Sequence, residues 1–387
     1  MSHVIPGLQQ FVANVPASVR HRRTGLLTNP SGIDNRLRTN VDQLDAHPDV
    51  DLRALYGPEH GVRGDVQAGD HVADAVDARS GLPVYSLYGA TRTPSVEMLE
   101  PIDVLVIDLQ DIGVRYATYL ASVANAMEGC RAAGVDVVIL DRPNPLGGTL
   151  IAGNILDPAF ASFVGMPGLT TLHGLTIGEF ARFWADAADL PTPEVVPMSG
   201  WQRTDWFDNT HLPWVLPSPN LPTLDSVTCY PAVCLIEGTN LSEARGTTRP
   251  FELLGAPWVD PEGLAKALNG AGLPGVGFRP TWFSPWISKH KGELCGGVQL
   301  YVFDREGWDP IRTGVIILQT LKRMYPDEFG WTGFNEGGTF VDKLAGTNDL
   351  RLAIDGDGDI EDLLARWDRE ATRFAEIRLP FMMPEYA

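Results

Sequence analysis

The sequence predicts an α/β protein whose first part forms a parallel sheet and whose second, smaller part is of the α+β type. Residues 103–108 and 136–141 are nearly continuous runs of Val, Ile and Leu bounded by Asp, as expected for strands buried on both faces of a parallel sheet. Between them, residues 116–133 carry apolar side chains at helical spacing. Strand, helix and strand within about 35 residues predict a βαβ unit with a right-handed crossover.

The other elements of the first part are expected in the same alternating order. Residues 24–28 and 51–56 are two further candidate strands, 176–190 is a candidate helix, and 194–198 is a short candidate strand. A proline-rich stretch, 213–231, follows, and no helix or strand is predicted there.

The pattern changes near residue 240, where we place the domain boundary within a window of about 20 residues. Beyond it, 275–283 and 297–303 alternate as strands do, and 310–324 and 357–377 are expected to be helical. The predicted domains are residues 1–240 and 241–387.

Length and charge limit the possible classes of function. The chain has 387 residues, 44% of them hydrophobic. Single cores stop growing at about 250–300 residues, so two domains are expected. The formal net charge is −19, and no long basic cluster offsets it. Neither a nucleic acid nor an anionic membrane surface is therefore expected as a partner.

Cysteine usage and hydropathy favour an intracellular protein without a membrane span. The four cysteines, Cys130, Cys229, Cys234 and Cys295, include no CxxC pair and are interpreted as buried reduced thiols. No stretch of roughly 20 residues is apolar enough to cross a membrane. The first residues lack the basic and apolar segments of a signal peptide, so a cytoplasmic location is expected.

Polar side chains follow each of the first four predicted strands. In open α/β sheets, ligands bind outside the carboxyl ends of the strands, so these side chains are candidates for one site. They are Asn29 and Ser31 after the first strand, Glu59 and His60 after the second, Asp108, Gln110, Asp111 and Arg115 after the third, and Asp141, Arg142 and Asn144 after the fourth.

The loop Tyr56-Gly-Pro-Glu-His-Gly61 is the strongest candidate for catalysis. Pro58 stiffens the approach, and the two glycines tolerate backbone angles that other residues resist. A glutamate such as Glu59, partly desolvated at the mouth of a sheet, suits a general acid. The alternative interpretation is a surface turn with an incidental acid.

Asp108 ends an apolar strand, where an unpaired carboxylate is costly, and Arg115 is its expected partner. This pair either orients a substrate hydroxyl or the catalytic acid, or is a structural ion pair beside the next helix. Asn144, between two prolines, offers donor and acceptor groups for sugar hydroxyls or an acetamido group, or else stabilises a turn.

Two later segments carry further polar candidates. Thr176 and Glu179 match a capping box, which is the favoured interpretation of Glu179, and His173 lies just before that helix, where it can face the cleft. Segment 237–247 is dense in small polar residues. Its acids Glu237 and Glu243, with Arg245, favour a binding loop over an exposed linker.

Several familiar chemistries lack their motifs. The sequence contains no GxGxxG after the first strand, no GxxxxGK[ST], no HExxH and no GxSxG. Neither a dinucleotide nor a P-loop nucleotide site is therefore indicated, and no cofactor is expected. His60, Asp108 and His173 are able to gather a metal, although their spacing is not diagnostic.

Seven motifs in order give the chain a family resemblance. Together they resemble the bacterial NamZ-type exo-β-N-acetylmuramidases, from about residue 20 to the C-terminus. The motifs are Tyr56-Gly-Pro-Glu-His-Gly61, Leu82-Pro-Val-Tyr-Ser-Leu-Tyr-Gly89, Asp108-Leu-Gln-Asp-Ile-Gly-Val-Arg115, Leu140-Asp-Arg-Pro-Asn-Pro145, His173-Gly-Leu-Thr-Ile-Gly-Glu179, Pro217-Ser-Pro-Asn220, and Glu237-Gly-Thr-Asn240 through Arg245-Gly-Thr-Thr-Arg-Pro-Phe251.

The resemblance implies a Rossmann-like catalytic domain and a smaller α+β domain that closes the active-site cleft. It also implies release of N-acetylmuramic acid from the non-reducing ends of peptidoglycan fragments, with Glu59 as the leading catalytic residue. His60 is a partner of unassigned role. The other motifs contribute residues of the cleft, and the predicted substrate-binding set is Asn29, Gln110, Arg115, Tyr119, Asn144, His173, Asn220, Glu237, Asn240 and Arg245.

Glycoside hydrolysis usually requires two carboxyl groups beside the scissile bond, and some families use the substrate's N-acetyl group instead. With Glu59 as general acid, the second group is Asp108, Glu237 or the N-acetyl group. Arg115 or Arg245 is expected to bind the lactyl carboxylate of muramic acid, because Arg matches carboxylates bidentately. Two rival interpretations are a non-catalytic carbohydrate-binding protein on the same fold and a metal-dependent hydrolase.

Overall fold

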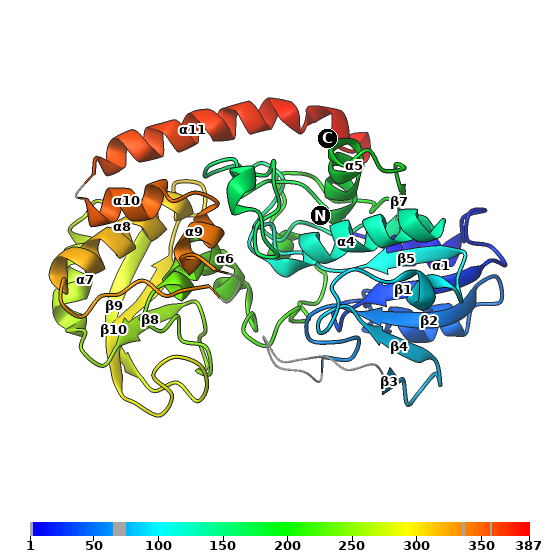
Figure 1. Cartoon of the computed structure of the whole chain (residues 1–387), viewed down its shortest axis with the longest axis horizontal. Coiled ribbons are helices and arrows are strands. Elements are labelled where there is room, and N and C mark those ends of the chain that lie inside the picture. Colours follow the sequence, from blue (N-terminus) through cyan, green and yellow to red (C-terminus); the bar gives the residue numbers. More distant parts are fainter. Residues whose placement is uncertain (1–2, 65–74, 335–336, 357) are drawn as a thin grey trace.

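The structure, a computed structural model, describes residues 3–64, 75–334, 337–356 and 358–387. It contains two domains that lie side by side, each with its own sheet (Figure 1). The first domain is built on a seven-stranded sheet and the second on a three-stranded sheet. This arrangement confirms the predicted α/β fold with a second, smaller α+β unit.

The large sheet has the strand order β3-β4-β2-β1-β5-β6-β7. All neighbouring strands are parallel except β3 and β4, which are antiparallel. The order reverses between β1 and β5, the kind of switch point at which open α/β sheets bind ligands. The strands are β1 (Arg23–Thr28), β2 (Asp51–Gly57), β3 (Ala75–Val76), β4 (Pro83–Ser86), β5 (Val104–Asp108), β6 (Asp136–Leu140) and β7 (Glu194–Val196).

Helices cover both faces of this sheet, because its central strands are apolar on both sides. Val104 and Val106 of β5 pack with α1 and α2, whereas Leu105 and Ile107 pack with α4 and α5. Burial on both faces explains why this strand is a continuous apolar run. The helices are α1 (Gly7–Ala13), α2 (Asn40–Asp45), α3 (Val96–Leu99), α4 (Thr118–Ala133) and α5 (Ile177–Ala187), with short 3-10 turns η1 (Pro158–Phe160) and η2 (Phe207–Thr210).

The second domain packs helices against one antiparallel sheet of order β8-β10-β9. The predicted strands 275–283 and 297–303 are β9 and β10, which pair over eight residues each. The elements are α6 (Leu224–Val233), η3 (Cys234–Gly238), β8 (Leu253–Ala256), α7 (Pro261–Asn269), β9 (Val276–Phe283), β10 (Cys295–Val302), α8 (Pro310–Met324), α9 (Phe340–Ala345), α10 (Asp349–Asp355), α11 (Ile360–Ile377), η4 (Leu379–Phe381) and η5 (Pro384–Tyr386).

The two domains are joined at more than one place along the chain. Helix α6 packs with the second domain although it precedes residue 240. Helix α11 then crosses back towards the first domain (Figure 1). There the hydroxyl of Tyr386 donates a 2.6 Å hydrogen bond to Asp141 and accepts one of 3.0 Å from the backbone of Met198. The domain limits drawn near residue 240 remain a prediction.

Helix α6 overlaps the end of the proline-rich stretch 213–231, for which no element was predicted. Thr223 caps its start by accepting a hydrogen bond from the backbone of Ser226. Pro231 lies in the last turn, where the helix loses one backbone donor. Within the described ranges, no helix is long and apolar enough to cross a membrane.

Candidate active site

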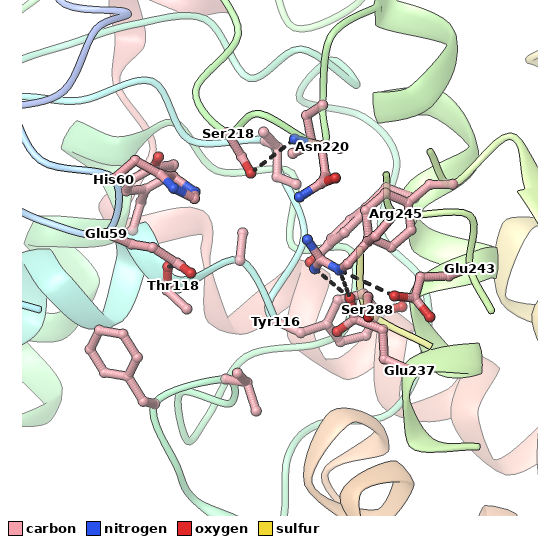
Figure 2. Close-up of a pocket in the computed structure, with 18 of the residues that line it drawn as sticks. Glu59, His60, Tyr116, Thr118, Ser218, Asn220, Glu237, Glu243, Arg245 and Ser288 are labelled. Carbon is pink, nitrogen blue, oxygen red and sulfur yellow. Dashed lines mark hydrogen bonds and ion pairs between the residues drawn. The ribbon is translucent and has the colours of Figure 1, made fainter. Parts of the chain in front are cut away.

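A cavity of about 850 Å³ lies between the two domains (Figure 2). The first domain contributes the loops after β2 and β4 and the start of α4, and the second contributes the segments around residues 237–245 and 287–289. The polar and aromatic lining includes Glu59, His60, Tyr88, Arg92, Tyr116, Thr118, Tyr119, Phe163, Ser218, Asn220, Tyr230, Glu237, Glu243, Arg245, Phe251, Ser288, Lys289, Phe334 and Phe340.

The loop after β2 places Glu59 at the mouth of this cavity. The backbone of Gly61 donates a 2.9 Å hydrogen bond to the carbonyl of Pro58, which closes a tight turn. His60 and Gly61 both adopt positive φ, at 73° and 74°. Such a conformation is uncommon for a residue other than Gly, and backbone strain of this kind concentrates at functional sites. His60 is buried, whereas Glu59 is partly exposed to the cavity.

Three hydroxyl groups surround the Glu59 carboxyl group. Thr118, the first residue of α4, donates a 2.7 Å hydrogen bond to its Oε2. Burial raises the pKa of Tyr88, and the charge of Glu59 and a hydrogen bond to it raise that pKa further. Burial also raises the pKa of Tyr119, again with a contribution from the charge of Glu59. Glu59 is thus held among neutral hydroxyl groups.

The wall contributed by the second domain carries four charged residues, Glu237, Glu243, Arg245 and Lys289, which we call the distal wall. Arg245 donates through Nε and Nη2 to Oε1 of Glu237, and its Nε lies 3.2 Å from Glu243. Lys289 lies 3.0 Å from the other oxygen of Glu243. Figure 2 shows Glu237, Glu243 and Arg245 on the opposite side of the cavity from Glu59.

The residues of the distal wall make further contacts and are partly desolvated. The guanidinium of Arg245 lies 5.0 Å from the ring centre of Phe251, and Lys289 also donates to the carbonyls of Ile236 and Thr239. Burial raises the pKa of Glu237 although Arg245 opposes this shift. Burial acts to lower the pKa of Arg245, but the charges of the two glutamates raise it above its ordinary value, so that residue stays charged.

Aromatic side chains form the floor and the sides of the cavity. The hydroxyls of Tyr116 and Tyr119 donate to the backbone carbonyls of Pro231 and Pro217, which fixes both rings. Arg92 lies over the ring of Phe163 at 4.3 Å. An apolar cavity with a few fixed polar groups is typical of a small-molecule site.

Asp108 does not occupy the place expected for a catalytic group. It is fully buried at the end of β5, where Nε and Nη2 of Arg142 donate to its two oxygens over 2.5 and 2.9 Å. Asn40 donates a further 2.8 Å hydrogen bond. The predicted catalytic role of Asp108 is therefore corrected to a structural one at the switch point, because its oxygens are enclosed by these partners.

Arg115 is not the partner of Asp108, which corrects a second expectation. Its side chain is fully buried and donates to the carbonyls of Asn154 and Leu169 in the first domain. It also donates to the carbonyls of Leu344 and Ala345 at the end of α9. Burial lowers its pKa to about 10. Arg115 thus links the domains and does not reach the cavity.

The other predicted site residues divide into two groups. Tyr119, Asn220, Glu237 and Arg245 line the cavity together with Glu59 and His60. The remaining ones, all polar, hold backbone turns or loops: Asn29 accepts from Ser31, Gln110 donates to the carbonyl of Pro143, Asn144 donates to that of Leu175, His173 accepts from the backbone of Leu175, and Asn240 donates to the carbonyl of Glu328.

The geometry also tests two other predictions, the capping box of Glu179 and a metal site at His60, Asp108 and His173. Glu179 and Thr176 form the predicted capping box, and Arg203 makes an ion pair with the same glutamate. His60, Asp108 and His173 do not meet at one point, since Nε2 of His173 faces Asp111 at 3.6 Å. Among the residues that the structure describes, no three His, Cys, Asp or Glu side chains are placed to hold a metal ion.

Several cavity residues escaped the sequence interpretation. Thr118 is the first residue of α4, and apart from its position after a strand nothing in the sequence indicated a role for it in the site. Tyr88 belongs to the motif 82–89, but its hydroxyl gave no hint of a role. Arg92 and Lys289 are single basic residues in loops. Glu243 was noted as an acid of the binding loop and proves to be part of the distal wall.

The cavity between an α/β domain and a smaller domain, with carboxyl groups on two walls, fits the class of glycoside hydrolases. A family model described as exo-β-N-acetylmuramidase NamZ, N-terminal, matches residues 24–225, and the corresponding C-terminal model matches residues 228–383. The chain belongs to this NamZ family and is a glycosidase, which confirms the resemblance found in the motifs.

Known proteins are similar to this chain in sequence or structure over almost its whole length. The peptidoglycan β-N-acetylmuramidase NamZ of Bacillus subtilis is 45% identical over 378 residues, which are 97% of this chain and 90% of that protein. A crystal structure of a DUF1343 family protein from Bacteroides fragilis superposes with a TM-score of 0.90 at 36% identity, covering 98% of this chain and 99% of that one. A second such protein from the same organism gives 0.76 at 28% identity, with 99% of each chain covered.

Proposed function

We propose that this protein removes N-acetylmuramic acid from the non-reducing ends of peptidoglycan fragments, with Glu59 as the general acid. Membership of the NamZ exo-β-N-acetylmuramidase family supports the activity and the class of substrate. The observation that carries the residue assignment is the position of Glu59, a partly exposed carboxyl group that a strained turn holds in the cavity.

The surroundings of Glu59 suit proton donation to the leaving oxygen. Thr118 fixes Oε2 and Glu59 lines the cavity, so its carboxyl group lies where the glycosidic oxygen of a bound substrate is expected. A positioned general acid contributes about 10²- to 10⁴-fold to the rate. His60 lies beside Glu59 in the cavity lining, and its role stays unassigned.

Because Asp108 is enclosed by its partners, fewer candidates remain for the second catalytic group. Two of the earlier alternatives remain, which are Glu237 and the N-acetyl group of the substrate. Glu237 is already engaged by Arg245 on the distal wall.

Arg245 is the better candidate for the lactyl carboxylate, since Arg115 is enclosed by backbone carbonyls. Its Nε and Nη2 are used by the two glutamates, whereas its Nη1 donates no hydrogen bond to any residue in the described part of the chain. A charged donor that faces the cavity is suited to a carboxylate.

Turnover of a chromogenic β-glycoside of N-acetylmuramic acid by the purified protein tests the proposal. Glu59→Gln is expected to lose most of that activity while still binding N-acetylmuramic acid. Binding without any turnover by the unaltered protein would favour the carbohydrate-binding alternative. Loss of activity in a chelator, reversed by added metal, would favour the metal-dependent alternative.

The cytoplasmic location expected from the sequence is part of the proposal, because such an enzyme would act on imported fragments. Separation of cells into fractions, followed by detection of the protein with an antibody, tests this location.

A further inference from the structure

Three polar groups, two on the distal wall and one on the neighbouring Asn220, have no hydrogen-bond partner among the residues of the described ranges. Oε2 of Glu237 accepts no hydrogen bond, because Arg245 donates to Oε1 only. Nη1 of Arg245 donates none, as noted above. Nδ2 of Asn220 is also without a partner although this residue is only 4% exposed. Buried polar groups are normally paired, so the buried Nδ2 of Asn220, next to the partly exposed side chains of Arg245 (21%) and Glu237 (13%), indicates a bound polar ligand.

These groups form one corner of the cavity. Figure 2 shows Asn220 beside Arg245, with Glu237 below them and Glu59 on the far side. The corner offers one carboxylate acceptor and two donors. A hydroxyl group requires one acceptor and one donor, which Glu237 and Asn220 supply together.

The chemistry of a pyranose ring decides which hydroxyl group reaches this corner. The anomeric carbon C1 and carbon C4 lie at opposite ends of the ring. A sugar that lies across the cavity with its glycosidic oxygen beside Glu59 directs its C4 end towards the distal wall, since the two line opposite sides. Carbon C3, which bears the lactyl group of muramic acid, is adjacent to C4, so the lactyl carboxylate falls near Arg245.

We propose that Glu237 and Asn220 recognise the free 4-hydroxyl group of the terminal N-acetylmuramic acid residue, and that this contact restricts the enzyme to chain ends. The inference rests on the proposed function, because it takes Glu59 as the group beside the glycosidic oxygen. In an internal residue, O4 carries another sugar. That sugar would meet the ion pairs between Arg245, Glu237 and Glu243, which line this side of the cavity.

In this account Glu237 binds substrate and does not attack the anomeric carbon. The two roles predict different behaviour towards a substrate without the 4-hydroxyl group. A specificity residue affects only substrates that carry the group it contacts, whereas a catalytic carboxylate affects every substrate alike.

The test compares a chromogenic β-glycoside of N-acetylmuramic acid with its 4-deoxy analogue. For the unaltered protein, kcat/KM is expected to be about 10- to 100-fold lower for the 4-deoxy substrate, as for the loss of a hydrogen bond to a charged group. In Glu237→Gln this difference is expected to shrink to about 3-fold or less, because the charged acceptor is gone. Asn220→Ser should reduce it in part.

Glu243→Gln is the matched control, because it removes one charge from the same ion-pair group without removing the proposed contact. It should retain the preference for the 4-hydroxyl substrate, whatever its effect on the absolute rate. Equal losses on both substrates in Glu237→Gln, with the preference intact, would overturn the inference and favour a catalytic role for Glu237.

Failure of the proposed function would look different. If the unaltered protein turned over neither glycoside, the proposed activity would be wrong. Calorimetric binding of N-acetylmuramic acid and its 4-deoxy form would then test the corner itself. Equal affinities for both sugars in the unaltered protein would contradict the inference, and a weaker 4-deoxy complex that Glu237→Gln makes equal would support it.

Discussion

The hydroxyl of Thr118 donates a 2.7 Å hydrogen bond to Oε2 of Glu59, which joins the first turn of α4 to the loop after β2. This contact fixes the carboxyl group that we assign as the general acid. It connects the loop after β2 with the start of α4, 59 residues away in the sequence, and it depends on the hydroxyl of one threonine.

Thr118→Val is expected to lower kcat by about 10-fold, because a hydrogen bond to a charged group contributes about 1.5–3 kcal/mol and positions the acid. KM for the chromogenic glycoside should change little. Thr118→Ser keeps the hydroxyl and should keep most of the rate. Steady-state kinetics of both variants check this, and equal kcat values in Val and Ser variants would show that the hydrogen bond has no role.

The buried pair of Asp108 and Arg142 should matter for stability and not for chemistry. Asp108→Asn leaves the charge of Arg142 without its partner, which costs about 3–5 kcal/mol in such pairs. Thermal unfolding should show a clearly lower Tm, while kcat per folded molecule stays within about 2-fold. The double variant Asp108→Leu with Arg142→Met should recover part of the stability. A loss of kcat without a loss of stability would return Asp108 to the catalytic candidates.

Arg245 should discriminate between muramic acid and glucosamine substrates. Arg245→Met is expected to reduce kcat/KM for the N-acetylmuramic acid glycoside by about 100-fold, as for a lost charged contact, and to affect the N-acetylglucosamine glycoside much less. Because Met leaves the charges of Glu237 and Glu243 unbalanced, Arg245→Lys is the control that keeps the charge. Equal losses on both substrates in the Met variant would rule out a contact with the lactyl group.

The stability of the protein is expected to depend on pH through Asp141, a buried carboxyl group of the first domain that contacts Tyr386 near the C-terminus. Burial raises the pKa of this carboxyl group from 3.8 to about 6, although Tyr386, Gly178 and Thr176 donate to it. The folded state therefore favours the protonated form. The stability from this group is complete below pH 3.8 and is lost as the pH rises through about 6.

Relative to Asp141→Asn, which does not titrate, the free energy of unfolding should fall by up to roughly 3 kcal/mol between pH 4 and pH 7. Denaturant unfolding of both proteins at several pH values measures this difference. A difference that does not vary with pH would contradict the assignment.

The sequence predicted the large elements because their apolar periods are clear. Helix α8 matches the predicted range 310–324, and β5 and β6 match two predicted strands within one residue at each end. The loop with Glu59 was also placed correctly at a strand end, since strand ends meet at one edge of a parallel sheet.

The partners of charged residues could not be predicted in the same way. Arg115 is seven residues from Asp108 and looked like its partner, but Arg142 from the end of the next strand occupies that place. The register of β5 against β6 brings those two ends together, and no local pattern records this. The hydrogen bond between Thr118 and Glu59 could not be predicted for the same reason, because it also depends on how distant segments pack.

The central claim is that Glu59 donates the proton to the leaving oxygen, and kinetics with leaving groups of different acidity test it most directly. Glu59→Gln should lose about 10²- to 10⁴-fold in kcat on a muramic acid glycoside that has a poor leaving group. It should lose far less on one with a strongly acidic phenol, which leaves without protonation. Equal retention of near-normal kcat on both substrates, or equal loss on both, would contradict the account.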